Sequence, residues 1–136
     1  MELLEARRLT GANWLWAYPG AILEVALGAG EDADEVARAW RTELTAGLEA
    51  LSLEVRTVRR DYPGGMSLAF AAPIDALYSA VSIGELAWAA AQARLSGEPY
   101  PNLAQAWKAV EQELIAERSP RLVELAEEAA RRGINL

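Results

Sequence analysis

Two segments of the sequence share one order of patterns: two stretches of alternating apolar residues, then a stretch with helical spacing. We expect strands over residues 5–16, 22–27, 53–59 and 66–71. The alternation is clear at Leu23, Val25 and Leu27, which would share one face of a strand. Pro-Gly at positions 19–20 and 63–64 favours type II turns. The pattern predicts two hairpins, each followed by a helix.

Helical spacing of apolar residues predicts four helices. The first, over residues 34–51, has its apolar stripe at Val36, Trp40, Leu44, Leu48 and Leu51. The second covers residues 73–95, the third begins after a capping Asn102, and the fourth runs from Ser119 to a stop at Gly133. In the fourth helix we expect these residues to point inward: Leu122, Leu125, Ala126 and Ala129.

These elements fit an α+β fold in a single domain that spans residues 1–136. The expected architecture is a four-stranded, mainly antiparallel sheet built from a repeated strand–strand–helix unit. The first two helices would pack on one face of the sheet. The two C-terminal helices would close one end of it.

Composition narrows the chemistry that this chain can perform. It contains neither cysteine nor histidine, which removes thiolate nucleophiles, the usual side-chain base near neutral pH and the commonest metal ligands. We therefore expect no metal and no cofactor. The net charge of −7 argues against nucleic acid as a partner, because affinity for a phosphate backbone depends on clustered cations. The apolar stretches are too short to span a bilayer and the start MELLEARR lacks the basic region of a signal peptide, so we expect a cytoplasmic protein.

Glu85 stands out because it interrupts an apolar helical segment. It follows Val81 by four positions and precedes Trp88 by three, so helical spacing places it within or beside the apolar stripe. There it would act as a general base or as an acid that grips a ligand. Alternatively, it lies at the edge of the stripe or pairs with an arginine. Asp75, near the start of the same helix, is typical of an acid that interacts favourably with the helix dipole.

Arginines and aromatic residues give two further candidate surfaces. The arginines lie on the first and third expected strands: Arg7, Arg8, Arg56, Arg59 and Arg60. If those strands were neighbours, the guanidinium groups would converge and hold a carboxylate, a phosphate or an acidic polypeptide. Otherwise they form a solvated face balanced by nearby acids. A row of aromatic residues along the first hairpin would stack a ligand or fill the core or an interface: Trp14, Trp16 and Tyr18.

Three parts of the chain carry a resemblance to a known family. They are TGANW at residues 10–14, the glycine turn and helix that contain GGMSLAFA (64–71) and IGELA (83–87), and the closing segment 117–135. Together they resemble the N-terminal domain of cyanophycin synthetase and its Mur-ligase-like relatives. The resemblance implies a domain that helps to hold the growing or accepting peptide while a separate ligase module performs catalysis. Some cyanophycin synthetases carry a zinc-binding His-x-x-Glu-His pattern in the matching helix. Here residues 82–86 read SIGEL, only Glu85 matches, and zinc-dependent hydrolysis is disfavoured.

Three hypotheses follow. The first is a non-catalytic peptide-binding or assembly domain that acts with a separate Mur-ligase-like chain, with ligand or partner contacts at Asn13, Arg59, Arg60 and Glu85. The second is a small metal-free hydrolase or isomerase, in which Glu85 is the base and Arg59 or Arg60 stabilises developing charge. The third is a structural homo-oligomer that buries an apolar patch around Trp14 and Trp16.

Overall fold

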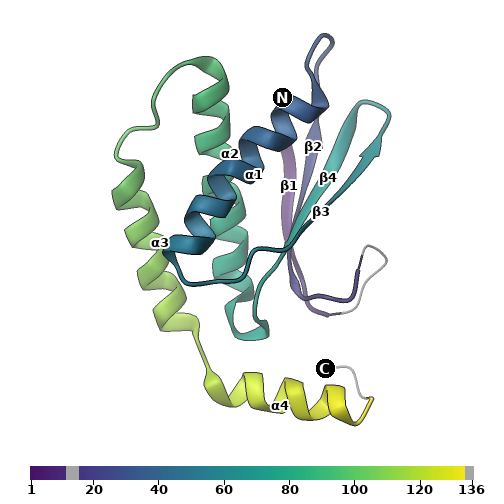
Figure 1. Cartoon of the computed structure of the whole chain (residues 1–136), viewed down its shortest axis with the longest axis vertical. Helices are drawn as coiled ribbons and strands as arrows, with labels where there is room; N and C mark the ends of the chain where they lie inside the picture. Colours follow the sequence, from purple (N-terminus) through teal and green to yellow (C-terminus); the bar gives the residue numbers. More distant parts are fainter. Residues whose placement is uncertain (12–15, 134–136) are drawn as a thin grey trace.

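An antiparallel sheet with helices on one of its faces organises the part of the chain that the computed structural model describes, residues 1–11 and 16–133 (Figure 1). In chain order the elements are β1 (Glu2–Leu9), β2 (Gly20–Ala26), α1 (Ala33–Ala50), β3 (Thr57–Tyr62), β4 (Gly65–Ala71), the 3₁₀ turn η1 (Ile74–Ala76), α2 (Leu77–Ser96), α3 (Leu103–Glu117) and α4 (Pro120–Arg131). The predicted α+β fold and its two strand–strand–helix units are confirmed.

The strands lie in the order β1-β2-β4-β3, and each neighbouring pair is antiparallel. The two hairpins therefore meet through β2 and β4, and the first strand of each hairpin is at an outer edge. Strands β2 and β4 lie between the edge strands β1 and β3, so the arginines of the two edge strands do not converge. The predicted common site for all five arginines is ruled out by the strand order.

The two Pro-Gly sequences have different roles. Tyr62 pairs directly with Gly65, so residues 63–64 form a tight hairpin turn, with Gly64 at a φ of 81°. In the first hairpin β1 ends at Leu9 and β2 begins at Gly20. The predicted strand over residues 5–16 is therefore confirmed only for residues 5–9, and the predicted tight turn at Pro19-Gly20 is wrong because Gly20 is already paired in the sheet. Gly20 instead starts β2, where a Cβ atom would lie 1.9 Å from the carbonyl oxygen of Phe70.

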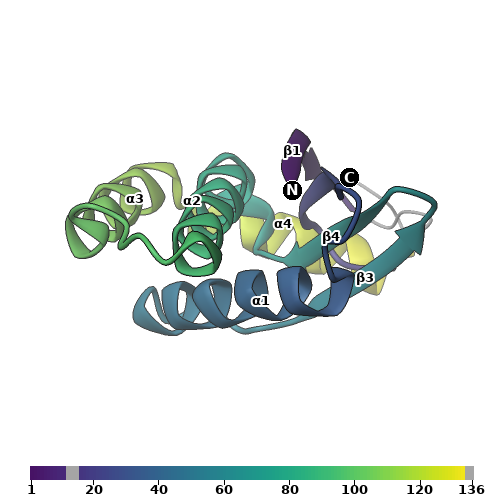
Figure 2. The same cartoon turned by 90° about the horizontal axis from the view of Figure 1, so that it is seen from above.

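Helices α1 and α2 pack side by side on one face of the sheet, as Figure 2 shows. The predicted stripe on α1 is buried at Val36, Trp40, Leu44 and Leu48. Alternating residues of β2 and β4 meet these helices: Leu23, Val25, Met66, Leu68 and Phe70. Each such side chain contributes about 1.5–3 kcal/mol when it leaves water, so this layer is the main source of stability.

Asp75 interrupts the helix that the sequence predicts from residue 73. Its backbone is non-helical (φ −93°, ψ 16°), and η1 precedes α2 instead of continuing into it. Asp75 is 2% exposed, and its carboxylate accepts hydrogen bonds from Nε of Arg118 (2.8 Å) and from the backbone N–H of Ser119 (2.7 Å). Asp75 is therefore more than an acid at a helix start, because it fastens the junction between α3 and α4.

Glu117 makes a second attachment at the same junction. Its carboxylate accepts hydrogen bonds from the backbone N–H groups of Tyr78 (2.9 Å) and Ser79 (2.8 Å), and from the Ser79 hydroxyl (2.7 Å). It thus supplies acceptors for the unpaired N–H groups at the start of α2. The position of α3 against α2 depends on this contact as well as on apolar packing.

Helix α4 crosses the lower end of the molecule in Figure 1 and packs against η1. Ser119 caps it by accepting a hydrogen bond from the backbone N–H of Leu122 (3.4 Å). The prediction that its leucines point inward is wrong, because Leu122 is 39% exposed and Leu125 is 54% exposed, whereas Ala129 is buried. The amphipathic pattern of α4 is real, but much of its apolar stripe faces outward. Among the described residues no helix combines the length and apolar character needed to cross a membrane.

Candidate binding site

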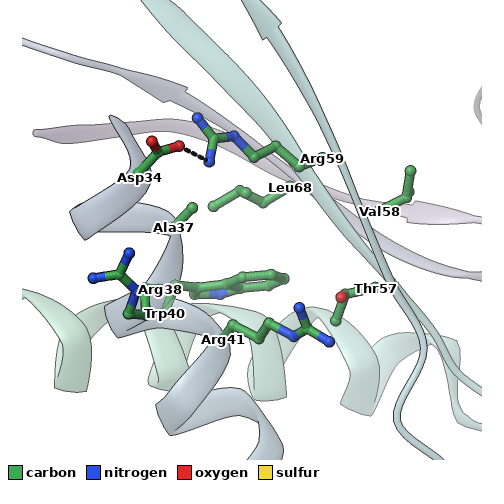
Figure 3. A pocket seen from close by; sticks show the side chains of 9 residues that line it. All are labelled: Asp34, Ala37, Arg38, Trp40, Arg41, Thr57, Val58, Arg59 and Leu68. Carbon is green, nitrogen blue, oxygen red and sulfur yellow. Dashed lines mark hydrogen bonds and ion pairs between the residues drawn. The ribbon is translucent and has the colours of Figure 1, made fainter. Parts of the chain in front are cut away.

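An arginine-lined hollow lies between α1 and the edge strand β3. Its volume is about 370 Å³, and Figure 3 shows the side chains that surround it. Arg38 and Arg41 come from α1, and Thr57 and Arg59 come from β3. We call this feature the arginine hollow. A volume of this size falls within the range of small-ligand sites in proteins, roughly 300–1,000 Å³.

The local sequence of α1 explains how the hollow forms. Trp40 is 1% exposed and its ring packs against Phe70, with 6.2 Å between the ring centroids. Arg38 and Arg41 flank this anchored tryptophan and are both exposed. In Figure 3 the Arg41 side chain extends toward the β3 side of the hollow, where Thr57 lies. The buried tryptophan thus fixes the α1 wall of the hollow, from which the Arg41 side chain extends toward β3 and the Arg38 side chain extends the other way (Figure 3).

Arg59 is already occupied by carboxylates of the chain. It donates from Nη1 to Asp34 (2.7 Å), and from Nε and Nη2 to the two oxygens of Asp61 (2.6 and 2.8 Å). The hydrogen bond to Asp61 is the largest cause that raises the pKa of Arg59, and the same bond lowers the pKa of Asp61. Arg59 therefore forms a fixed, charge-balanced wall rather than an open cation.

Arg38 and Arg41 differ from Arg59 in this respect. Neither side chain forms a hydrogen bond or ion pair with a carboxylate within residues 1–11 and 16–133. The indole N–H of Trp40 is buried, and it too has no acceptor in that part of the chain. An unpaired buried donor is destabilising by about 1–3 kcal/mol. The hollow therefore combines two available cations with the ring of Trp40, whose buried N–H has no acceptor among the described residues.

Of the four residues that the sequence singled out, the three that the structure describes do not form one site. Arg59 pairs in register with Leu68 and lines the arginine hollow. Arg60 is exposed and pairs in register with Ser67, so it lies on the opposite face of the sheet. Glu85 is exposed on α2 and does not line the hollow. Asn13 lies outside the described residues.

Glu85 lies at the edge of the α2 apolar stripe, the second of the two positions considered for it. Its neighbours Gly84 and Leu86 are buried, while Glu85 itself is exposed. Gly84 marks a close approach of α2 to the sheet, since a Cβ atom there would lie 2.8 Å from Cδ1 of Leu23. The conformation of this segment is explained by helix–sheet packing.

Sequence reasoning missed the arginine hollow because the helical pattern of α1 singled out only its apolar stripe. Arg38 and Arg41 lie outside that stripe and are exposed, yet both line a hollow beside β3. The available signal was their spacing of three residues around Trp40, which places both guanidinium groups beside one buried ring. The position of β3 was the missing information.

The sheet face away from the helices carries a separate polar network centred on Glu24. The Glu24 carboxylate accepts hydrogen bonds from the hydroxyls of Tyr62 (3.1 Å) and Ser67 (2.7 Å), and it lies 3.5 Å from Nη1 of Arg7. Burial is the largest cause that raises the pKa of Tyr62, and the hydrogen bond to Glu24 raises it further. Since these groups satisfy one another, the network joins β1, β2, β3 and β4 and leaves no open cation.

No protein-family model matches this chain, and a search of curated protein sequences finds no match either. The resemblance to the N-terminal domain of cyanophycin synthetase therefore stays a hypothesis.

Proposed function

We propose that this chain is a non-catalytic binding module whose arginine hollow takes an acidic peptide segment. The observation that carries the proposal is the pair Arg38 and Arg41, which border a hollow of about 370 Å³ without a carboxylate partner among the described residues. Guanidinium groups bind carboxylates through paired N–H donors. In a chain of net charge −7, two adjacent unpaired arginines are the natural place for an anionic ligand.

The edge position of β3 favours an extended peptide over a small free anion. Strand β3 pairs with β4 alone in the described sheet, so its other edge has backbone groups that an added strand can use. Side chains of such a strand alternate, which brings every second residue toward α1. Acidic residues at those positions would reach Arg38 and Arg41, with Thr57 beside them on β3.

The resemblance supports the same reading, since the related module helps to hold a peptide while a ligase acts. We therefore propose a cytoplasmic module that presents a peptide to a separate Mur-ligase-like chain. The hydrolase hypothesis gains no support from the geometry, because Glu85 is exposed and lines neither the arginine hollow nor the second hollow described below. Co-purification of the chain with a ligase encoded beside it tests the partner. We expect this co-purification to be lost when Arg38 and Arg41 are both changed to glutamate.

Binding of a labelled hexa-aspartate peptide, followed by fluorescence anisotropy, tests the ligand class. The double variant Arg38→Gln/Arg41→Gln should weaken binding about tenfold or more, because it removes roughly one to two charge-assisted hydrogen bonds to the peptide. The matched control Lys108→Gln/Arg121→Gln removes the same charge from two exposed positions on α3 and α4. It should change the affinity by less than about twofold at physiological ionic strength. Equal losses in both variants would show that net charge alone governs binding and would contradict the proposal.

A homo-oligomer is the second candidate, and the exposed stripe of α4 favours it. Leu122 and Leu125 are large apolar residues open to solvent, and the same helix carries both arginines and glutamates around them. Two antiparallel copies of α4 would bury the leucines and set opposite charges against each other. Light scattering after gel filtration should then show a dimer that Leu122→Ser/Leu125→Ser converts to a monomer. A monomeric wild type at high concentration would exclude this candidate.

A further inference from the structure

A second hollow lies on the other side of the molecule, between β1 and the helices α2 and α3. Its volume is about 540 Å³. Arg8 of β1 and Glu113 of α3 both line it, and Tyr78, Val81 and Ser82 of α2 lie between them. Opposite charges thus enter one cavity from two different elements. The arginine hollow has no such free acidic counterpart, because the Asp34 carboxylate that lines it is bound to Arg59.

The Arg8 guanidinium is held in place without being neutralised. Its Cζ atom lies 4.1 Å from the centroid of the Tyr78 ring, which is a cation–π contact. Within the described residues Arg8 forms no ion pair, whereas its neighbour Arg7 contacts Glu5 and Glu24. Stacking engages the face of the guanidinium and leaves its N–H groups, which lie in the plane, available for a carboxylate.

Glu113 is held in a similar way. Its Oε1 atom accepts a hydrogen bond from the Ser82 hydroxyl (3.0 Å), which fixes the carboxylate at the cavity wall. Arg8 and Glu113 form no ion pair with each other, although both line the same hollow. A carboxylate that is oriented by a hydroxyl and open on its other side is suited to accept hydrogen bonds from an ammonium group.

We propose that this hollow binds a small α-amino zwitterion, a free amino acid or a dipeptide. Arg8 would take the carboxylate and Glu113 the ammonium group. The apolar wall formed by Val81 and the Tyr78 ring would accommodate an aliphatic side chain. The proposal does not depend on the peptide function of the arginine hollow, since the two cavities share no lining residue.

Titration of the full chain with L-leucine and with L-leucyl-L-leucine, by calorimetry and by backbone NMR shifts, tests this site. We expect saturable binding of one or both, with shifts centred on Arg8, Tyr78 and Glu113. N-acetyl-leucine and leucinamide, which each lack one charge, should bind about tenfold more weakly or not at all. Whichever of the two zwitterions binds more tightly shows whether the site takes a free amino acid or a dipeptide.

Charge variants complete the test. Arg8→Gln and Glu113→Gln should each weaken binding about tenfold or more, while Tyr78→Phe, which keeps the ring, should bind like the wild type. Arg121→Gln is the matched surface control and should have no effect. Arg8 and Glu113 are exposed, so thermal melting should confirm that the variants remain folded. The proposal is overturned if neither zwitterion binds, or if the two charge variants bind as well as the wild type does.

Discussion

Gly65 lies at a close approach between β2 and β4, and replacing it with alanine should destabilise the fold. A Cβ atom there would lie 2.2 Å from the carbonyl oxygen of Val25 and 2.7 Å from Cε2 of Tyr62. Both distances are roughly 1 Å or more short of van der Waals contact. The Val25 oxygen belongs to the backbone of a central strand, so it cannot move aside as a flexible side chain would.

The expected cost follows from that geometry. Overpacking of a well-packed core costs about 1–3 kcal/mol. Moving β4 away from β2 would also weaken the neighbouring backbone hydrogen bond from Leu27 to Gly64 (2.9 Å), worth about 1 kcal/mol. Alanine restricts the unfolded chain and returns about 0.4–1 kcal/mol. We expect Gly65→Ala to lower the free energy of unfolding by about 2–3 kcal/mol.

Urea unfolding followed by circular dichroism measures this change. With a slope of about 1–3 kcal/mol per molar urea, the midpoint should fall by roughly 1 M or more. Gly11→Ala is the control, because its Cβ atom would meet nothing within 4 Å in the part of the chain that the structure describes. The double variant Gly65→Ala/Tyr62→Ala should stay destabilised, since the clash with Val25 remains. If Gly65→Ala unfolds within about 0.5 kcal/mol of the control, the described approach of β2 to β4 is wrong.

Two further predictions concern the polar contacts. The pKa of Tyr62 in the folded chain is raised above its ordinary value of 10.0. The neutral Tyr62 side chain therefore stabilises the fold fully below pH 10.0, and this stabilisation is lost as the pH rises through the higher folded-state pKa. In urea unfolding, the wild type should therefore lose more stability than Tyr62→Phe does when the pH is raised from about 8 to about 11. Equal losses in the two proteins would contradict the claim that burial and Glu24 raise the pKa of Tyr62. Glu117→Ala should lower the free energy of unfolding by about 1–2 kcal/mol and speed amide exchange at Ser79, because three hydrogen bonds to its carboxylate are lost. Unchanged exchange at Ser79 would show that the α2 start does not depend on this contact.

The sequence predicted the elements well where one periodicity dominates. The stripe of α1 was identified because Val36, Trp40, Leu44 and Leu48 repeat with helical spacing and each meets the sheet. The hairpin at Gly64 was identified because a two-residue Pro-Gly turn is a local property. Local signals of this kind do not depend on which elements become neighbours in space.

Some of the predictions that depended on spatial neighbours failed, although the antiparallel sheet and the packing of α1 and α2 on one of its faces were predicted. The order β1-β2-β4-β3 arises from pairing between strands of different hairpins, and no local pattern specifies it. The amphipathic pattern of α4 showed that Leu122 and Leu125 can be buried, but not that the described chain would leave them exposed. Asp75 was expected at a helix start, and its contact with Arg118 depends on a segment more than forty residues away.

The candidate site was only partly accessible from sequence for the same reason. Arg59 was singled out as an arginine of the third strand, and it does line the arginine hollow. Its carboxylate partners, Asp34 and Asp61, come from α1 and from β3 itself, so its occupied state became visible only in the fold. Arg38 and Arg41 became candidate ligand contacts only because β3 passes beside α1 in the fold.

The most direct test of the arginine hollow is the side-chain N–H signal of Trp40 during titration with hexa-aspartate peptide. The chain has five tryptophans, so a Trp40→Phe variant assigns the signal in the ¹⁵N spectrum. We predict that the Trp40 indole signal shifts saturably with peptide in the wild type and stays fixed in Arg38→Gln/Arg41→Gln. A peptide that binds the wild type while this signal does not move would show that the acidic ligand sits elsewhere.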